Sequence, residues 1–151
     1  MQKNYKGDIL DMLCNDLMNM VINEASNPED RIASFGALVF GHMLKYQYQP
    51  FKQSASWIEI IVKKGIPEIQ RCLSVKKGLR KRITSSDLDK WYNDGLKNIA
   101  IPETKGYNIN FPEQRPEDWT LDNILDYEFI KNFLVSNAQT IYAKNYLEKY
   151  I

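Results

Sequence analysis

The sequence predicts an all-α fold, a compact bundle of five or six helices with a long packed irregular loop around residues 100–119. Apolar residues recur at intervals of three and four along several segments, which places them on one face of a helix. No segment alternates polar and apolar residues over the length of a strand. A chain of 151 residues suffices for one core. We therefore expect a single helical domain over residues 1–151, with residues 130–151 as a C-terminal helical extension.

The first two predicted helices are separated by a stop followed by a strong start signal. Apolar residues follow helical spacing over residues 9–25. Asn27 then suits the N-cap of a second helix, and Pro28 suits its first position, where a missing N–H costs nothing. This second helix should end before Pro50, because the residue preceding a proline disfavours helical geometry. It contains two glycines that would let a neighbouring helix come close, Gly36 and Gly41.

Two further helices are predicted in the middle of the chain. The third begins with a capping box from Ser56 to Glu59, in which each side chain satisfies a backbone N–H of the other residue. Pro67 lies inside its apolar pattern and predicts a kink or a restart near Gly65, because proline removes a helical hydrogen bond. The residues Ser85-Ser86-Asp87 predict the cap of a fourth helix.

The C-terminal third combines a proline-punctuated connection with more helix. Connections of nearly twenty residues are uncommon in compact domains. The aromatic residues Tyr107, Phe111 and Trp119 are costly to leave in water, so this loop is expected to pack on the helices. Thr120 predicts the cap of a short helix, and one last helix is predicted from Phe129 to the end.

Residues 42–57 read HMLKYQYQPFKQSASW. This string resembles the domain of unknown function 29 family, common in cyanobacteria and other bacteria, whose signature reads approximately HLLKWQYQP followed by RSRSW. Two later segments resemble the family as well, GIPEIQRCL at 65–73 and FPEQRPEDWTLDNILDYEF at 111–129. The resemblance covers residues 35–129. It implies a compact helical bundle of a bacterial protein without an assigned activity.

Three departures from the family pattern bear on function. The N-terminal helix resembles the family poorly, and residues 130–151 extend past the usual end. Gln53 and Ala55 stand where the family carries arginine. If that arginine pair served the function of the family, this chain has lost it.

The only histidine of the chain, His42, defines one candidate site, because any histidine-based proton transfer must use it. The candidate polar cluster consists of His42, Tyr46, Gln49 and Trp57. Such a cluster could form a small-ligand site or an active site. A hydrogen-bonded structural histidine fits the same residues, and we favour that interpretation because buried polar side chains usually belong to packing networks.

A basic stretch defines a second candidate site. Between Lys45 and Arg82, ten Lys or Arg stand against two Glu, a local net charge of +8, whereas the whole chain carries +1. Such asymmetry is typical of a surface that binds phosphates, and nucleic-acid binding through it would be sensitive to salt. Solvation of a helix face explains the same charges. The candidate anion-binding residues are Lys63, Lys64, Arg71, Lys76, Lys77, Arg80, Lys81 and Arg82.

Several classes of function lack their sequence signals. There is no glycine-rich phosphate loop and no nucleophile elbow. Cys14, Cys72 and the single histidine lack the spacing of a zinc site, so we predict no metal, no cofactor and no catalytic residue. Two cysteines, no leader and no membrane-spanning stretch predict a cytoplasmic protein.

The leading hypothesis is accordingly a non-enzymatic protein-interaction or regulatory module of a bacterial cell. Its partner would be another protein or a second copy of the chain. Nucleic-acid binding through residues 63–82 is the alternative, and a site around His42 is the third candidate.

Overall fold

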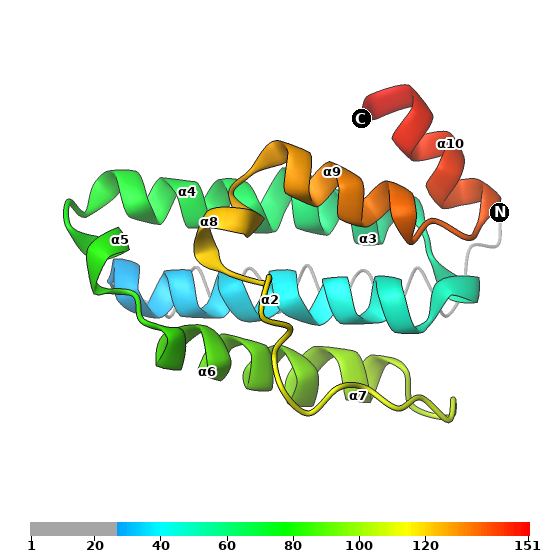
Figure 1. The fold of residues 1–151 in the computed structure, drawn as a ribbon, viewed down its shortest axis with the longest axis horizontal. Coiled ribbons are helices and arrows are strands. Elements are labelled where there is room, and N and C mark those ends of the chain that lie inside the picture. Colours follow the sequence, from blue (N-terminus) through cyan, green and yellow to red (C-terminus); the bar gives the residue numbers. More distant parts are fainter. Residues whose placement is uncertain (1–26) are drawn as a thin grey trace, which may run out of the picture.

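The computed structural model describes residues 27–151, and every regular element in that part of the chain is a helix. The predicted all-α class is thus confirmed, whereas the helix predicted over 9–25 and Cys14 lie outside the described residues. Three long rods lie side by side, with α2 (Pro28–Tyr48) in the middle (Figure 1). The other two rods span residues 55–75 and 85–103. They consist of α3 (Ala55–Glu59), η2 (Ile60–Gly65) and α4 (Ile66–Val75), and of α6 (Ser85–Gly95), η3 (Leu96–Ala100) and α7 (Ile101–Glu103).

The remaining elements are shorter and connect or cover the rods. Helix α9 (Tyr127–Ser136) packs on the described core, and α10 (Ile141–Tyr150) leaves the body at an angle (Figure 1). Three single turns complete the set: η1 (Pro50–Lys52), α5 (Leu79–Arg82) and α8 (Leu121–Ile124). No helix of the described part is both long and apolar enough to cross a membrane.

Helix α2 begins and ends where its sequence predicts. The Asn27 side-chain oxygen accepts a hydrogen bond from the N–H of Asp30 at 2.8 Å, and Pro28 occupies the first turn. The helix ends at Tyr48, just ahead of Pro50. Local capping chemistry therefore defines both ends of the central rod.

Both outer rods contain a π-helical segment that is followed, after one isoleucine, by a proline. The N–H of Ile66 bonds to the carbonyl of Ile61, and the N–H of Ile101 bonds to the carbonyl of Leu96, each five residues back. The next residues are Pro67 and Pro102. A proline cannot donate to the usual carbonyl four residues back, and the wider turn ahead of it lets the helix continue. The break predicted near Gly65 is therefore a π turn.

Two predicted caps are wrong in position. The third helix has Ser54 rather than Ser56 at its N-cap position, and the Ser54 side chain makes no capping bond there. The hydroxyl groups of Ser54 and Ser56 bond to each other at 2.8 Å, so no capping box forms there. In the fourth helix the cap is Thr84, which forms a complete capping box with Asp87. A threonine directly before the predicted serines makes the same local bonds.

The C-terminal third differs from the prediction in two respects. The irregular loop begins at Thr104, because the third rod continues through Pro102. Trp119 is buried and stacks on Phe40 with ring centroids 5.6 Å apart, as expected for a packed loop, but Tyr107 is half exposed. The last helix is two helices, α9 and α10, separated at residues 137–140.

Close contact between α2 and α6 depends on glycines, as the sequence predicts for α2. A Cβ atom on Gly36 would collide with the Trp91 ring, and one on Gly41 would lie 2.7 Å from Ile99. Gly95 on α6 differs because its neighbours are backbone atoms: its Cβ would lie 2.5 Å from the backbone oxygen of Ala37. The backbones of the two helices therefore meet without intervening side chains.

The contact at Gly95 predicts the sign of a substitution. In an ordinary helix, Gly→Ala stabilises by about 1 kcal/mol. Gly95 has helical torsion angles, so only the clash opposes the change. We expect Gly95→Ala to lower the free energy of unfolding by about 1–3 kcal/mol, because the neighbouring atoms are backbone and cannot rotate away. Urea unfolding would measure this. Exposed Lys97→Ala is the control, with an expected change within about 0.5 kcal/mol; a stabilised Gly95→Ala would contradict the close contact.

Candidate functional site

The segment 42–57 buries its polar residues instead of presenting them to solvent. All four members of the predicted cluster, His42, Tyr46, Gln49 and Trp57, are buried. The structure adds two buried members that sequence reasoning missed as site residues, Lys45 and Gln53, and one partner from a distant helix, Glu103. This layer lies where the ends of all three rods meet.

His42 is held in a neutral, hydrogen-bonded state. Its Nδ1 lies 2.9 Å from the carbonyl oxygen of Leu38, one turn back, so the Nδ1–H donates to that oxygen. The side chain is fully buried. Burial, and second the positive charge of Lys45, hold the pKa of His42 well below its ordinary 6.5. The ring is therefore uncharged at neutral pH, which fits the structural interpretation.

Lys45 is 1% exposed and finds its counter-charge on another rod. Its ammonium group lies 2.5 Å from a carboxylate oxygen of Glu103 at the end of α7, and 4.4 Å from the centroid of the Trp57 ring. A buried ammonium without such partners would cost several kcal/mol. The ion pair and the cation–π contact therefore join α2 to α7 and α3.

Gln53, at the position where the resembling family carries arginine, ties the C-terminal segment to α2. Its side-chain N–H groups donate to the carbonyls of Tyr46 and Asn137, both at 2.7 Å. Its side-chain oxygen accepts from the N–H of Gln139 at 2.8 Å, and its own carbonyl accepts from the Thr140 hydroxyl at 3.0 Å. These bonds hold residues 137–140 irregular, which is why the predicted last helix is broken there.

Tyr46 makes a second connection to the C-terminal segment. Its hydroxyl donates to the carbonyl of Leu134 at 2.7 Å, and burial raises its pKa well above the ordinary value. Together with Gln53 it anchors α9 and the start of α10 on α2. The buried polar cluster thus joins the C-terminal segment to α2.

Cys72 lacks the environment of a reactive thiol. It is buried in the core, and burial raises the pKa of its thiol. A nucleophilic cysteine requires the opposite shift. Within residues 27–151 there is no group of three or more His, Cys, Asp or Glu arranged to hold a metal ion.

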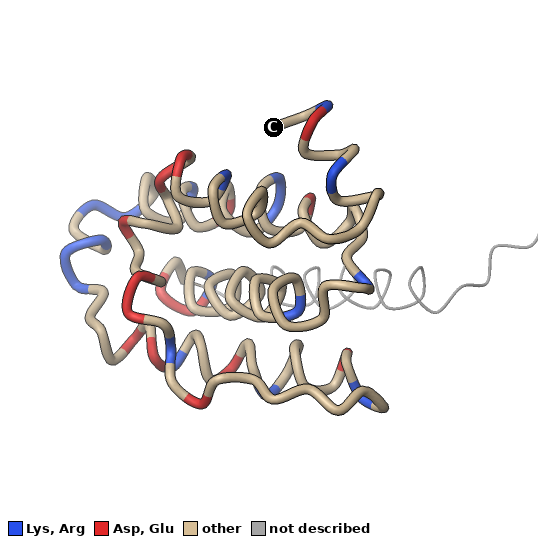
Figure 2. The backbone as a smooth tube through the Cα atoms, turned by 45° about the vertical axis from the view of Figure 1, so that its right-hand side comes forward, with Lys and Arg blue, Asp and Glu red and all other residues tan. Residues whose placement is uncertain are grey.

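Several residues of the basic stretch pair with carboxylates, three of them with carboxylates from other parts of the fold. Figure 2 shows residues 76–82 gathered at one end of the bundle with acidic residues beside them. Arg80 lies 2.6 Å from Asp122, and Lys76 and Arg82 both approach Glu29, at 2.5 and 3.7 Å. Arg71 pairs with Glu68 at 2.6 Å and Lys63 with Glu59 at 3.7 Å. In the described part of the chain, no ion pair involves Lys77 or Lys81.

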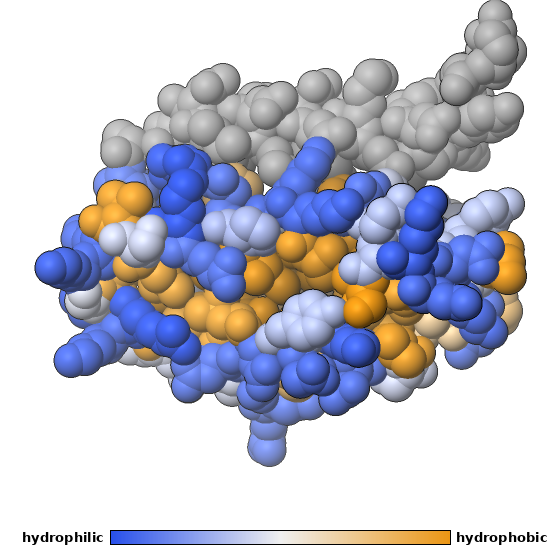
Figure 3. Space-filling model, turned by 90° about the horizontal axis from the view of Figure 1, so that it is seen from above, coloured by the Kyte–Doolittle hydropathy of each residue, from blue (hydrophilic) through white to orange (hydrophobic). Residues whose placement is uncertain are grey.

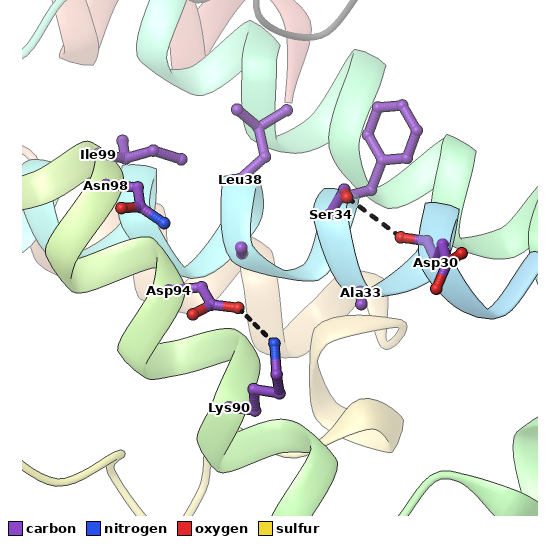
Figure 4. Close-up of a pocket in the computed structure, with 10 residues that line it drawn as sticks. Asp30, Ala33, Ser34, Leu38, Lys90, Asp94, Asn98 and Ile99 are labelled. Carbon is purple, nitrogen blue, oxygen red and sulfur yellow. Dashed lines mark hydrogen bonds and ion pairs between the residues drawn. The ribbon is translucent and has the colours of Figure 1, made fainter. Parts of the chain in front are cut away.

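A groove of about 410 Å³ lies between α2 and α6 (Figure 4). Its small floor residues, Ala33 and Ala37, come from α2, and Lys90 and Asp94 on α6 point toward each other across its edge at 3.0 Å. These two charges satisfy one another. The charged lining of this groove is therefore mixed in sign, with Lys90 beside Asp94 on α6 and Asp30 on α2.

A second groove, of about 340 Å³, lies between α4, α9 and the end of α10. Figure 3 looks onto this side of the molecule and shows an apolar strip bordered by hydrophilic residues. Most of the described lining residues are aliphatic or aromatic, and the two charged side chains among them belong to lysines. The lining residues are Val62, Lys63, Ile66, Pro67, Gln70, Ile124, Leu125, Tyr127, Ile130, Lys131, Leu134, Tyr150 and Ile151.

The helices beside this groove expose large apolar side chains to solvent. On α10, Ile141 is 62% and Tyr142 is 69% exposed. The inner face of the same helix is buried through Ala143, Tyr146 and Leu147. The other exposed large apolar residues of this segment are Tyr127, Val135 and Tyr150. We call this set the C-terminal apolar surface.

Comparison with models of protein families gives a match over most of the chain. The family model described as "Domain of unknown function DUF29" matches residues 6–130. It begins upstream of the helix predicted from Ile9, so the N-terminal region that resembled the family poorly lies within the match. The match ends inside α9, so α10 lies beyond it. No curated protein and no solved structure matches the chain.

The state of His42 predicts how stability depends on pH. The unfolded chain has a histidine pKa of about 6.5, and the folded value is lower, so below about pH 6.5 the unfolded state binds a proton that the folded state excludes. Stability should be complete above this pH and fall on acidification, by up to about 1.4 kcal/mol per pH unit. Urea unfolding between about pH 7.5 and 5.5 measures this slope. The non-titrating variant His42→Asn should show a flatter profile; an equal slope would assign the effect to another group.

The bonds of Gln53 predict a local effect on α10. Gln53→Ala leaves the buried carbonyls of Tyr46 and Asn137 without this donor, at a cost of about 1–3 kcal/mol. We expect amide hydrogen exchange to accelerate in α10 more than in α6. The control is Gln114→Ala in the exposed part of the loop, which should leave both helices unchanged. Uniform acceleration in both helices would show that Gln53 supports the whole fold instead.

Proposed function

The chain belongs to the DUF29 family, to which no activity is attached, and we propose that this member is a non-enzymatic protein-interaction module that binds through its C-terminal apolar surface. The observation that carries the proposal is the clustering of exposed apolar side chains on α9 and α10. Of the nine large apolar residues exposed in the described part, five lie within 127–150. Exposed apolar area favours association, since its removal from water is worth about 25 cal/mol per Å².

The way α10 is held supports this proposal. Thr140 caps the helix, its hydroxyl lies 3.0 Å from the carbonyl of Gln53, and the hydroxyl of Tyr127 donates to the carbonyl of Ile151 at 2.9 Å. Both ends of α10 are therefore fixed. A surface held in one geometry loses less entropy on binding, so a partner retains more of its contact energy.

Nucleic-acid binding is the weaker candidate on electrostatic grounds. Four of the eight basic residues proposed for it, Arg71, Lys76, Arg80 and Arg82, lie within 4 Å of a carboxylate, and Lys63 has a weak, exposed pair with Glu59. Each pair lowers the positive potential that phosphates would meet. Lys77 and Lys81 remain available, but two exposed lysines give a small electrostatic gain at physiological salt.

We further propose that residues 1–151 act as one helical domain of the bacterial cytoplasm, with residues 130–151 as its C-terminal extension. The bonds of Tyr46 and Gln53 to Leu134 and Asn137 support a shared structure for the extension and the family region. The buried thiol of Cys72 suits a reducing compartment.

Site-specific photocrosslinking in the cell that makes the protein tests the interaction. A benzophenone side chain at Tyr142 should give a discrete adduct with a second protein, identified by mass spectrometry. The same group at exposed Lys97, on the α6 rod, is the control and should give none. Equal or absent adducts at both positions would contradict the proposal, and an adduct with nucleic acid would favour the alternative.

A further inference from the structure

The groove between α4, α9 and the end of α10 combines an apolar lining with charged side chains of one sign. Ile66 on α4 and Ile130 on α9 line it from opposite sides, and Lys63 and Lys131 are the charged residues among the described lining. A cavity of about 340 Å³ accommodates several side chains of a partner rather than a whole helix.

Both lysines can accept a new counter-charge. Lys63 is 52% exposed, its pair with Glu59 spans 3.7 Å, and its ammonium also lies 5.0 Å from the centroid of the Tyr150 ring. At this exposure both contacts contribute little, so a carboxylate arriving from solvent can add to them. Lys131 forms no ion pair with any residue of 27–151. Anionic groups at the rim would therefore meet two ammonium groups beside an apolar surface, where charge pairs are stronger than in bulk water.

The backbone requirements of a ligand favour a helix. The elements around the groove are helices, whose peptide groups bond to one another, and no strand edge occurs in residues 27–151. An extended peptide in an apolar groove would leave its own N–H and C=O groups unpaired, at a cost comparable to lost hydrogen bonds. A helix satisfies these groups internally and presents one apolar stripe.

The charges argue against a symmetric pair of copies through this groove. Two-fold symmetry would place the lysine rim of one copy against that of the other, and like charges brought together are unfavourable. We propose that the groove binds an acidic amphipathic helix of a partner protein, whose apolar stripe contacts Ile66 and Ile130 and whose carboxylates pair with Lys63 and Lys131. This inference rests on the proposed interaction function and specifies the chemistry of the partner.

Binding of designed helical peptides to the full chain tests the inference. One labelled peptide of about 16 residues, roughly four turns, carries leucine at helical spacing with glutamate beside it. Its twin carries lysine in place of glutamate. In fluorescence anisotropy at about 50 mM salt, we expect the glutamate peptide to bind about tenfold or more tightly than its twin. The double variant Lys63→Glu/Lys131→Glu should reverse this preference.

A matched control separates the groove from overall charge. The double variant Lys77→Glu/Lys81→Glu makes the same change in net charge on exposed residues outside the groove, and it should retain the preference for the glutamate peptide. Circular dichroism establishes that both variants are folded.

Several outcomes would overturn the inference: equal affinity for the two peptides, no binding of either, or a preference lost equally in the control. A dimer that the groove variant dissociates would also overturn it, because a second copy would then occupy the groove. A crosslink from Tyr142 together with failure of the peptides would leave the interaction function standing and reject only this partner chemistry.

Discussion

The central helix α2 is enclosed by protein along most of its length, and this enclosure constrains the rest of the fold. From Phe35 to Tyr46 its residues are buried, Ala37 alone being half-buried, although two of them, His42 and Lys45, are polar. A polar group inside such a helix must find its partner within the protein. The carbonyl of Leu38 serves His42, and Glu103 serves Lys45. The end of α7 has to lie where that carboxylate reaches Lys45, and this fixes the rod of residues 85–103 against α2.

Local signals in the sequence account for the parts of the fold that were predicted. The caps at Asn27 and Thr120 depend on atoms within three residues, and the glycines of α2 allow close approach by whichever helix packs beside them. The features that were missed depend on distant residues. Lys45 and Glu103 are 58 positions apart, and Gln53 contacts residues more than 80 positions away, so no local pattern indicates either. The interruption of the helix between α9 and α10 results from these contacts.

The candidate sites show the same division. Composition identified the basic stretch, but its partners Glu29 and Asp122 lie far from it in sequence, so the pairing that neutralises it was invisible. The polar cluster was found because His42 is unique, and its burial could not be read from spacing alone. The groove beside α10 went unrecognised because it is assembled from three separate segments. Only the apolar residues near the C-terminus gave a signal for it.

In each outer rod, the π turn ahead of the proline affects which way the residues beyond it face. Each residue of an α-helix advances the chain by about 100° around the axis, and a π turn holds about one residue more than the α turn it replaces. Deleting a residue between Ile60 and Gly65 would therefore let an ordinary α turn replace the π turn, and Ile69 and Cys72 would still face the core. The deletion would instead set the ring of Pro67 against the carbonyl four residues back. Deleting a residue within α4 has no such outlet and would rotate the rest of the rod by about 100°.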